Sequence, residues 1–471
     1  MALTASSIKD DDFARPSQGV LFDDPQQFDD QRSFCVDAEH RAYHDTTAKG
    51  FFSLLVQHDD RKRQSSYALE HMPTVLSLVD PTRDSWLTQA QFTRPNRRVV
   101  NLARIGLLFA DLDTYREPWA VGRSPDQLAA AVLHFCAEEG IPSPSLIVSS
   151  GRGLQVKWLL SSVLPRGALP RWNAVQKALV DKLRFVGSDP LARDASRVLR
   201  LVNTVNSRSG MVCHVVHVEE DGMGHPVRYE FDYLAEFLLP VSRASIVTSR
   251  QAREARERPD LKVIDGDGRK GLKRFSGRQL AWDRLEDLRR LAVMRRGVDG
   301  LVDEGSRMMH LFWRLNFLLL SGATNSALMM KEAGELARQL DPSWRWRQQE
   351  LGSLYAKAKA YEKGETVEFN GARHTPLYTP RNDTLISLFR ITDEEQSDLR
   401  TIISKTEARR RDALRKAASR AGKHVPRSVI AGRIDERRKE ALQLRAQGLS
   451  PDEIAQRLKV SRRTVFADLS G

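Results

Sequence analysis

Cysteine is scarce in this chain. Three cysteines occur among 471 residues, at Cys35, Cys136 and Cys213, and none belongs to a Cys-x-x-Cys pair. This distribution argues against both a disulfide framework and a cysteine-rich zinc site. It fits a reducing environment, and we expect the protein to be cytoplasmic.

Long apolar segments are also lacking. The apolar run from Leu128 to Leu133 is far shorter than the roughly 20 residues that a membrane-spanning helix needs. The first residues lack the basic stretch and the apolar core of about 7–15 residues that mark a signal peptide. No membrane role is expected.

The pattern Gly-x-x-x-x-Gly-Lys-Ser/Thr is missing as well, so no P-loop ATPase is recognisable.

Negative charge is outnumbered along the chain. The formal net charge is +13 at pH 7, with a calculated isoelectric point of about 9.7. From residue 401 onward, 18 Lys and Arg stand against 8 Asp and Glu. A basic protein without a membrane segment most often binds nucleic acid, and we expect the C-terminal tail to make that contact.

The length predicts two or three globular units, because one hydrophobic core seldom organises 471 residues. Changes in composition divide the chain into an N-terminal extension, an α+β domain, a polar linker, an all-helical domain, a basic helical connector and a C-terminal helical unit. The expected ranges are 1–44, 45–240, 241–277, 278–362, 363–429 and 430–471.

Short strand-like runs and amphipathic helices alternate in the α+β domain. One helix is expected to begin after Ser124, with Pro125 in its first position, and to end by Gly140. A second helix places Trp172, Val175, Leu179 and Leu183 on one face. The strand-like runs are Ile105–Phe109, Leu146–Val148, Val156–Leu160 and Val212–Val218.

The first chemical motif is an apolar strand, Ile105–Asp113, that ends in Asp111 and Asp113. Residues two apart on a strand point to the same side. Paired carboxylates are stabilised by a divalent cation, and Mg²⁺ or Mn²⁺ is the usual choice in nucleotidyl transfer. On this motif alone, a solvated turn at a strand end is an equally good explanation.

The second motif is a glycine-rich turn within Ser149–Trp158, which contains Arg152 and Lys157. Glycine lets backbone amides approach a phosphate closely, and the two basic side chains supply charge. A plain hairpin turn explains the glycines but not the basic side chains.

The third motif, Ser188–Arg208, combines Asp189 and Asp194 with a series of arginines. Arginine binds phosphate with two parallel hydrogen bonds, and a nearby acid can hold a metal ion. The combination suits a metal and triphosphate site, although a surface helix with Asp and Arg ion pairs is the alternative.

In this order and at these separations, the three motifs resemble those of the archaeo-eukaryotic primase superfamily. Its members have a strand ending in Asp-x-Asp or Asp-x-Glu, a Ser-x-His turn and a hydrophobic-Asp element. The third motif is similar to the form in plasmid and phage members, where Asp precedes Arg-Val-Leu-Arg-Leu-Pro-Gly-Thr-x-Asn-x-Lys. The resemblance covers about residues 45–240, and Glu304–Arg307 adds a weaker similarity to the helical domain that follows many such cores.

This resemblance implies an α+β catalytic domain with a primase-polymerase, RRM-like core, followed by an all-α domain. The implied activity is that of a DNA-dependent primase or polymerase that makes primers for a plasmid or other mobile element. A 3′-hydroxyl would attack the α-phosphate of a nucleoside triphosphate, with two Mg²⁺ or Mn²⁺ ions. The implied partners are template DNA, nucleoside triphosphates and, without a P-loop in this chain, a separate replicative helicase.

On the same resemblance, Asp111, Asp113 and Asp189 are the metal-binding and catalytic acids, with Asp194 as the alternative third acid. We favour Asp189 because its spacing from the arginines is similar to that in some primase-polymerases. The residues expected to bind the nucleotide are Ser150, Arg152, Gln155, Lys157, Arg197, Arg200 and Asn206.

The sequence departs from the family pattern in two places. Gln155 stands where the family usually has histidine, which keeps hydrogen-bonding capacity but loses the option of positive charge. Val202-Asn203 replaces Pro-Gly, and Arg208 replaces the usual Lys. The competing interpretation is therefore a DNA-binding replication initiator or regulator that keeps the fold without the chemistry. A third interpretation, a nuclease or relaxase on a similar fold, is disfavoured because the sequence offers neither a candidate catalytic tyrosine nor a His-rich metal cluster.

The C-terminal unit carries an independent motif. Ser450 and Glu453 form a predicted capping box around Pro451, and Ser461 can cap the next helix. The spacing resembles the helix-turn-helix of resolvases. The resemblance implies that Ser461, Arg462, Arg463 and Thr464 open a recognition helix and contact DNA. A plain helical hairpin is the alternative.

Overall fold

The computed structural model describes residues 35–239, 267–296, 301–369, 371–421 and 427–470. These residues form two compact units. The first comprises residues 1–381 with 398–402, and the second comprises residues 382–397 with 403–471. In the described part of the chain, no helix is both long enough and apolar enough to cross a membrane.

A mixed, mainly antiparallel sheet organises the first unit, in the order β11-β6-β7-β5-β4-β1-β3-β8, with β12 beside β7 and β2 beside β1. The long strand β5 (Leu102–Leu112) joins its two halves, because one edge pairs with β4 (Ala90–Phe92) near its beginning and the other edge pairs with β7 (Leu154–Pro165) along most of its length. The other strands are β1 (Phe51–His58), β2 (Arg61–Ala68), β3 (Ser85–Thr88), β6 (Leu146–Ser149), β8 (Val198–Arg200), β11 (His214–Val218) and β12 (Arg228–Tyr229), and a separate pair is formed by β9 (Val205–Asn206) and β10 (Met211–Val212).

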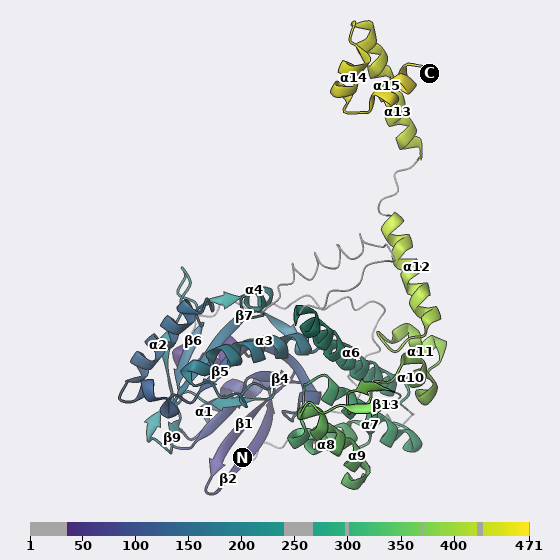
Figure 1. Ribbon diagram of the computed structural model, residues 1–471. Coiled ribbons are helices and arrows are strands. Elements are labelled where there is room, and N and C mark those ends of the chain that lie inside the picture. The colour runs from purple at the N-terminus through teal and green to yellow at the C-terminus, as the bar shows by residue number, and fades with distance from the viewer. Residues whose placement is uncertain (1–34, 240–266, 297–300, 370, 422–426, 471) are drawn as a thin grey trace. The chain divides into compact units, whose positions relative to one another are not determined.

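Helices α2 (Pro125–Glu138), α3 (Leu169–Lys182) and α4 (Phe231–Leu238) pack against the sheet (Figure 1). The predicted start of α2 is confirmed, since Ser124 and Gln127 form a capping box ahead of the helix. The apolar face predicted for α3 is confirmed as well. Trp172 is fully buried, and its indole N–H donates to the Leu107 carbonyl of β5 at 3.0 Å. Short α1 (Met72–Ser77) follows β2.

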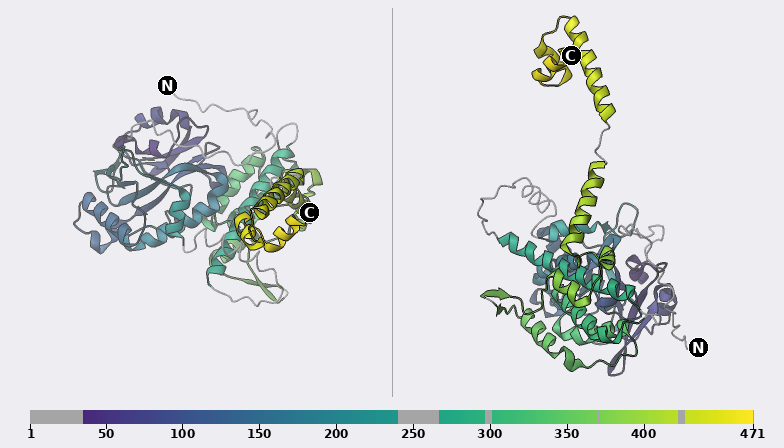
Figure 2. Two further views of the ribbon diagram at one scale, coloured as in Figure 1. Left: turned by 90° about the horizontal axis from the view of Figure 1, so that it is seen from above. Right: turned by 90° about the vertical axis from the view of Figure 1, so that its right-hand side faces the viewer.

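Among the described residues, four α-helices follow in the same unit: α6 (Asp267–Met294), α7 (Glu304–Leu320), α8 (Ser326–Leu340) and α9 (Gly352–Glu362). Figure 2 shows them, in teal to green, beside the sheet. The apolar face predicted for α7 is buried, as Leu311, Leu315 and Leu318 show. The linker expected at 241–277 lies mostly outside the described residues, and its last part belongs to α6.

The segment expected as a helical connector, 363–429, contains strands as well as helices. A hairpin of β13 (Val367–Phe369) and β14 (Ala372–His374) precedes α10 (Asn382–Phe389), α11 (Asp393–Asp398) and α12 (Lys405–Ala421). The two strands flank an Asn-Gly pair in the sequence, and Gly371 has a φ of +71°. Because Asn-Gly favours tight hairpin turns, this local signal outweighs the charged composition of the segment.

The C-terminal helices α13 (Arg427–Ala446), α14 (Pro451–Leu458) and α15 (Arg462–Leu469) surround a small core of Ala441, Leu444, Ile454 and Val465. The predicted caps are confirmed. Ser450 and Glu453 form the capping box of α14, and Ser461 accepts the Thr464 backbone N–H at 3.2 Å. The predicted fold class is confirmed: an α+β domain, a helical part and a C-terminal helix-turn-helix.

Candidate active site

A polar cavity of about 280 Å³ lies where the end of β5, the β6–β7 turn, β8 and the residues after β9 meet. Eleven of the residues that line it are charged, polar or, in the case of Trp86, aromatic. These are Lys62, Trp86, Asp111, Asp113, Ser150, Arg152, Gln155, Asp189, Arg197, Arg200 and Asn206; Tyr115, Gly153, Val198, Leu199 and Arg208 complete the wall. Every residue predicted for catalysis or nucleotide binding lines this cavity, apart from Lys157 and Asp194.

Three carboxylates meet because the segment before Asp189 runs alongside β5. The Asp189 backbone N–H donates to the Asp111 carbonyl at 2.8 Å, and the Asp113 N–H donates to the Gly187 carbonyl at 2.8 Å. Burial raises the pKa of Asp111 to about 6; Arg197 opposes the shift, and Asp113 and Asp189 reinforce it. A nearby cation would stabilise the ionised form of a carboxylate that is buried beside other carboxylates.

Carboxylate oxygens are the ligand type that a divalent cation prefers. Among the described residues, no three Asp, Glu, His or Cys side chains form a site that could hold an ion by themselves. Mg²⁺, however, usually takes one or two carboxylates and completes its shell with water and substrate phosphates. Asp111, Asp113 and Asp189 line one cavity, so the chain has enough carboxylates there for such an ion.

Cations from the third motif and from β2 line the same cavity. Arg197 lies 3.6 Å from Asp189, and its buried Nε has no hydrogen-bond partner among the described residues. The Arg200 guanidinium pairs with Asp84 and lies 4.9 Å from the Trp86 ring centroid, while the Lys62 ammonium lies 3.8 Å from the same centroid.

Sequence reasoning missed Lys62 and Trp86 as cavity residues. They lie on β2 and β3, outside the three motifs, and only the pairing of β1 with β2 and β3 brings them to β8. Arg208 was noted only as a replacement for the family's Lys, and it also lines the cavity. No local pattern around Lys62 or Trp86 would have revealed this placement.

The glycine-rich turn is shaped by a close backbone approach. A Cβ atom on Gly153 would lie 2.1 Å from the Leu112 carbonyl oxygen, so glycine is required where the turn meets β5. The Asn206 side-chain amide donates to the Ser150 carbonyl at 2.7 Å and ties the third motif to this turn. The Arg152 guanidinium stacks 3.9 Å from the Tyr115 ring centroid.

Gln155 is paired with Asp111 in the register of β5 and β7. Its side chain is 1% exposed, and Oε1 has no hydrogen-bond partner among the described residues. An unsatisfied buried acceptor is costly, so this oxygen suits a donor supplied by a bound molecule.

Lys157 lies outside the cavity. It is fully buried, and its ammonium donates to both Glu39 carboxylate oxygens at 3.0 Å and to the Tyr43 hydroxyl at 3.2 Å. Glu39 belongs to the 3-10 segment η2 (Val36–Ala42), within the expected N-terminal extension, which here contributes to the core of the sheet. The predicted nucleotide contact of Lys157 is therefore replaced, among the described residues, by this buried ion pair.

Asp194 also lies outside the cavity. Its Oδ1 accepts the Ser196 backbone N–H at 3.1 Å and the Ser196 hydroxyl at 2.6 Å, so its carboxylate closes a turn. Of the two alternatives for the third acid, the cavity contains Asp189, the residue that the sequence favours.

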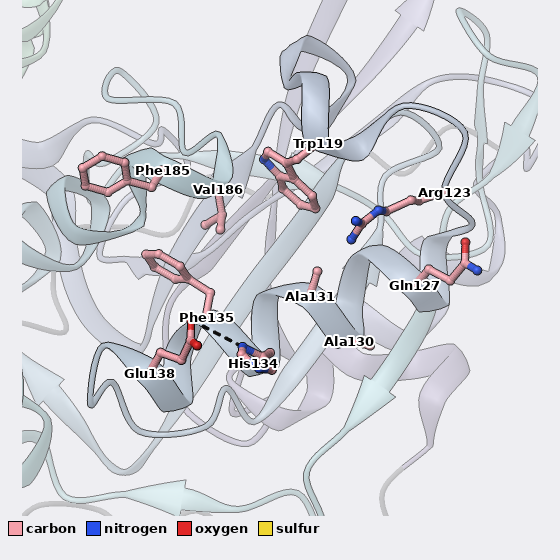
Figure 3. A pocket seen from close by; sticks show the side chains of 10 residues that line it. All are labelled: Trp119, Arg123, Gln127, Ala130, Ala131, His134, Phe135, Glu138, Phe185 and Val186. Carbon is pink, nitrogen blue, oxygen red and sulfur yellow. Dashed lines mark ion pairs between the residues drawn. The ribbon is translucent and has the colours of Figure 1, made fainter.

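A larger hollow of about 760 Å³ lies along α2 and contains no residue of the three motifs (Figure 3). Two of its lining residues, His134 and Glu138, lie 3.5 Å apart. The lining residues are Trp119, Arg123, Gln127, Ala130, Ala131, His134, Phe135, Glu138, Phe185 and Val186. None of them belongs to the predicted site, so the smaller polar cavity is the candidate active site.

The residues predicted to bind DNA lie at the start of α15. Ser461 is used as the helix cap, and its hydroxyl also contacts the Thr464 hydroxyl at 2.8 Å. Arg462 and Arg463 are exposed, and Arg462 lies 3.3 Å from Asp452 at the start of α14. The two arginines therefore present charge on the outer side of this unit.

Residues 432–467 match the family model of the homeodomain-like domain. The chain is 26% identical over 322 residues to a replication protein of Clostridium perfringens, a match that covers 68% of each chain. Solved structures with similarity include the primase-polymerase domain of cyanophage S-2L, at 17% identity over 40% of this chain and 90% of that chain, with a TM-score of 0.30. Another is primase RepB′, at 14% identity over 65% of this chain and 87% of that chain, with a TM-score of 0.26. The chain is thus similar to a replication protein over two thirds of its length, and the predicted C-terminal helix-turn-helix is confirmed as a homeodomain-like domain.

Proposed function

We propose that the chain is a replication primase that joins nucleotides on a DNA template and uses its C-terminal domain to hold duplex DNA. One observation carries the catalytic part of this proposal. Three carboxylates and five basic side chains converge on one cavity, although they come from separate motifs and from both halves of the sheet. The similarity to a replication protein supports the same conclusion.

The basic residues are suited to the triphosphate. Arg152, Arg197, Arg200, Lys62 and Arg208 surround a cavity too small for a folded macromolecule but of a size that suits a nucleotide's phosphates. Arg197 Nε lies 3.9 Å from the Asp194 carboxylate and makes no hydrogen bond among the described residues, so a phosphate oxygen would satisfy this donor. As charge moves toward the departing pyrophosphate, these cations stabilise it, and the rigid sheet positions the reacting groups.

The acids Asp111, Asp113 and Asp189 would hold the divalent ions. When bound, Mg²⁺ or Mn²⁺ lowers the pKa of the attacking 3′-hydroxyl and neutralises charge on the phosphates. Asp189 is fixed by its backbone bond to Asp111, so the third acid keeps its place relative to the first. Asn206 and Gly153 hold the neighbouring turn against β5, which keeps the nucleotide side of the cavity in register with the acids.

Primer synthesis on single-stranded DNA tests the proposal directly. The full chain is incubated with template, labelled ribo- or deoxynucleotides and Mg²⁺ or Mn²⁺. Asp189→Asn should lower the rate at least a hundredfold, because it removes one metal-binding charge at nearly constant shape. Asp194→Asn is the matched control from the same loop. Asparagine can also accept the Ser196 bonds, and the change removes only the 3.9 Å ion pair with Arg197, so the rate should fall far less than in Asp189→Asn.

Two outcomes would overturn the catalytic proposal. Equal rates for wild type and Asp189→Asn would remove Asp189 from the site. No product from the wild type with either metal would favour the alternative, a DNA-binding initiator that keeps the fold without chemistry.

Duplex binding is tested separately by deleting residues 427–471, which form α13 to α15. Synthesis on a single-stranded template should survive this deletion, whereas duplex affinity and its dependence on salt should fall. Unchanged duplex binding would refute the role of the C-terminal domain.

A further inference from the structure

The outer face of α15 carries an exposed aromatic ring one turn after two arginines. Phe466 is 47% exposed, and its neighbours Val465 and Asp468 are buried, at 0% and 3% exposure. Residues three and four apart share one face of a helix, so Arg462, Arg463 and Phe466 point outward together. The Arg462 guanidinium carbon lies 5.6 Å from the Phe466 ring centroid.

The buried side of the helix fixes this orientation. Val465 packs into the core of the C-terminal unit with Ala441 and Ile454. Asp468 accepts two hydrogen bonds from Arg437 of α13, at 2.6 and 3.0 Å, which locks the rotation of α15. Phe466 therefore cannot turn inward without breaking the core, and its exposure is a fixed property of the surface.

We infer that Phe466 reads a thymine in the major groove through contact with its 5-methyl group. This inference rests on the proposed binding of duplex DNA by the C-terminal domain. The flanking arginines complement phosphate, which places the same face against a polyanion. Of the four base pairs, only those with thymine offer an apolar group in the major groove, whereas the other base edges present polar donors and acceptors.

The arrangement divides the work between charge and apolar contact. Arg463 contributes to affinity for any sequence, whereas Phe466 adds preference for thymine at one position of the binding site. Loss of one buried methyl contact should weaken binding roughly fourfold.

The experiment uses the full chain and a duplex selected by the chain from a random library. Each thymine in turn is replaced by deoxyuridine, which lacks only the methyl group and pairs in the same way. Dissociation constants are measured for wild type, Phe466→Ala and the control Leu442→Ala, a change at an apolar residue of α13 that is 52% exposed. At one thymine, deoxyuridine should weaken the wild type and Leu442→Ala roughly fourfold and leave Phe466→Ala unchanged.

Three results would overturn the inference. The first is that deoxyuridine weakens Phe466→Ala as much as wild type, and the second is that no thymine is sensitive in the wild type. A third is that Phe466→Ala changes the sedimentation of the DNA-free protein, which would assign the ring to contact between two copies of the chain. Arg463→Ala separates this inference from the proposed function. If Arg463→Ala leaves the affinity for every duplex unchanged, the proposal that this face binds duplex DNA is wrong. If Arg463→Ala weakens binding but the deoxyuridine effect does not depend on Phe466, only the thymine contact is refuted.

Discussion

Glu332 is a buried acid in α8 that packs against the segment leading into β5. Its side chain is 1% exposed and accepts the backbone N–H groups of Val99 and Val100 at 3.4 and 3.3 Å. Burial raises its pKa from 4.5 to about 7, and the Val100 bond and Arg98 oppose that shift. Glu332→Gln removes the charge and keeps one of the two acceptor oxygens, so it loses one of these two bonds.

The sign of the effect follows from the raised pKa. The folded state holds the proton more tightly than the unfolded state, so stability falls as pH rises from about 4.5 to about 7. At about 1.4 kcal/mol per pKa unit, the ionised carboxylate costs about 3 kcal/mol above pH 7. At pH 5 the cost is under about 1 kcal/mol, because most of the folded protein is then protonated at this site.

Urea unfolding followed by tryptophan fluorescence, at pH 5 and pH 8, measures the difference. The stability of Glu332→Gln relative to wild type should be about 2–3 kcal/mol more favourable at pH 8 than at pH 5, because the lost hydrogen bond costs the same at both pH values. The matched change Glu335→Gln, one turn along α8, removes the ion pair with Arg338 and should not stabilise the protein at either pH. If Glu332→Gln is destabilising by the same amount at both pH values, the assignment of a strained carboxylate is wrong.

Three further changes test the architecture around the cavity. Gly153→Ala should cost about 1–3 kcal/mol and weaken nucleotide binding, because its Cβ would meet the Leu112 carbonyl; Gly167→Ala, with nothing within 4 Å, should leave Tm and nucleotide titrations unchanged. Lys157→Met should lower stability by about 3–5 kcal/mol, because it leaves the Glu39 carboxylate buried without an ion-pair partner. Adding Glu39→Leu should restore most of that stability in thermal melts. Unaltered nucleotide affinity in the double variant would exclude Lys157 from nucleotide binding. Arg97→Gln should raise the nucleotide KM roughly tenfold, since Arg97 donates to the Ser196 carbonyl at 2.8 Å and so positions Arg197; a lower Tm with an unchanged KM would make Arg97 merely structural.

Patterns within a short window were sufficient to predict much of the fold and part of the site. The caps at Ser124, Ser450 and Ser461 are local hydrogen bonds, so residue type and spacing reveal them directly. Asp111 and Asp113 share a strand end, and period-two geometry places both on the cavity wall.

Contacts between distant segments were beyond this kind of reasoning. Lys157 has the right charge beside the glycine-rich turn, and only Glu39, more than a hundred residues earlier, explains why it is buried. Lys62 and Trp86 reach the cavity because β2 and β3 pair with β1, and no short sequence motif predicts this pairing. The hairpin of β13 and β14 was missed because composition was weighed above its Asn-Gly turn.

The joining role of β5 has a consequence for exchange between related proteins. Its first residues pair with the half of the sheet that contributes Lys62 and Arg200, and its last residues pair with the half that contributes the glycine-rich turn. A chimera with a crossover inside this region would combine strands, cations and acids that come from different parents. Recombination that preserves function should therefore exchange residues 36–229 as one block, which keeps the strands of the sheet and the Glu39–Lys157 ion pair together.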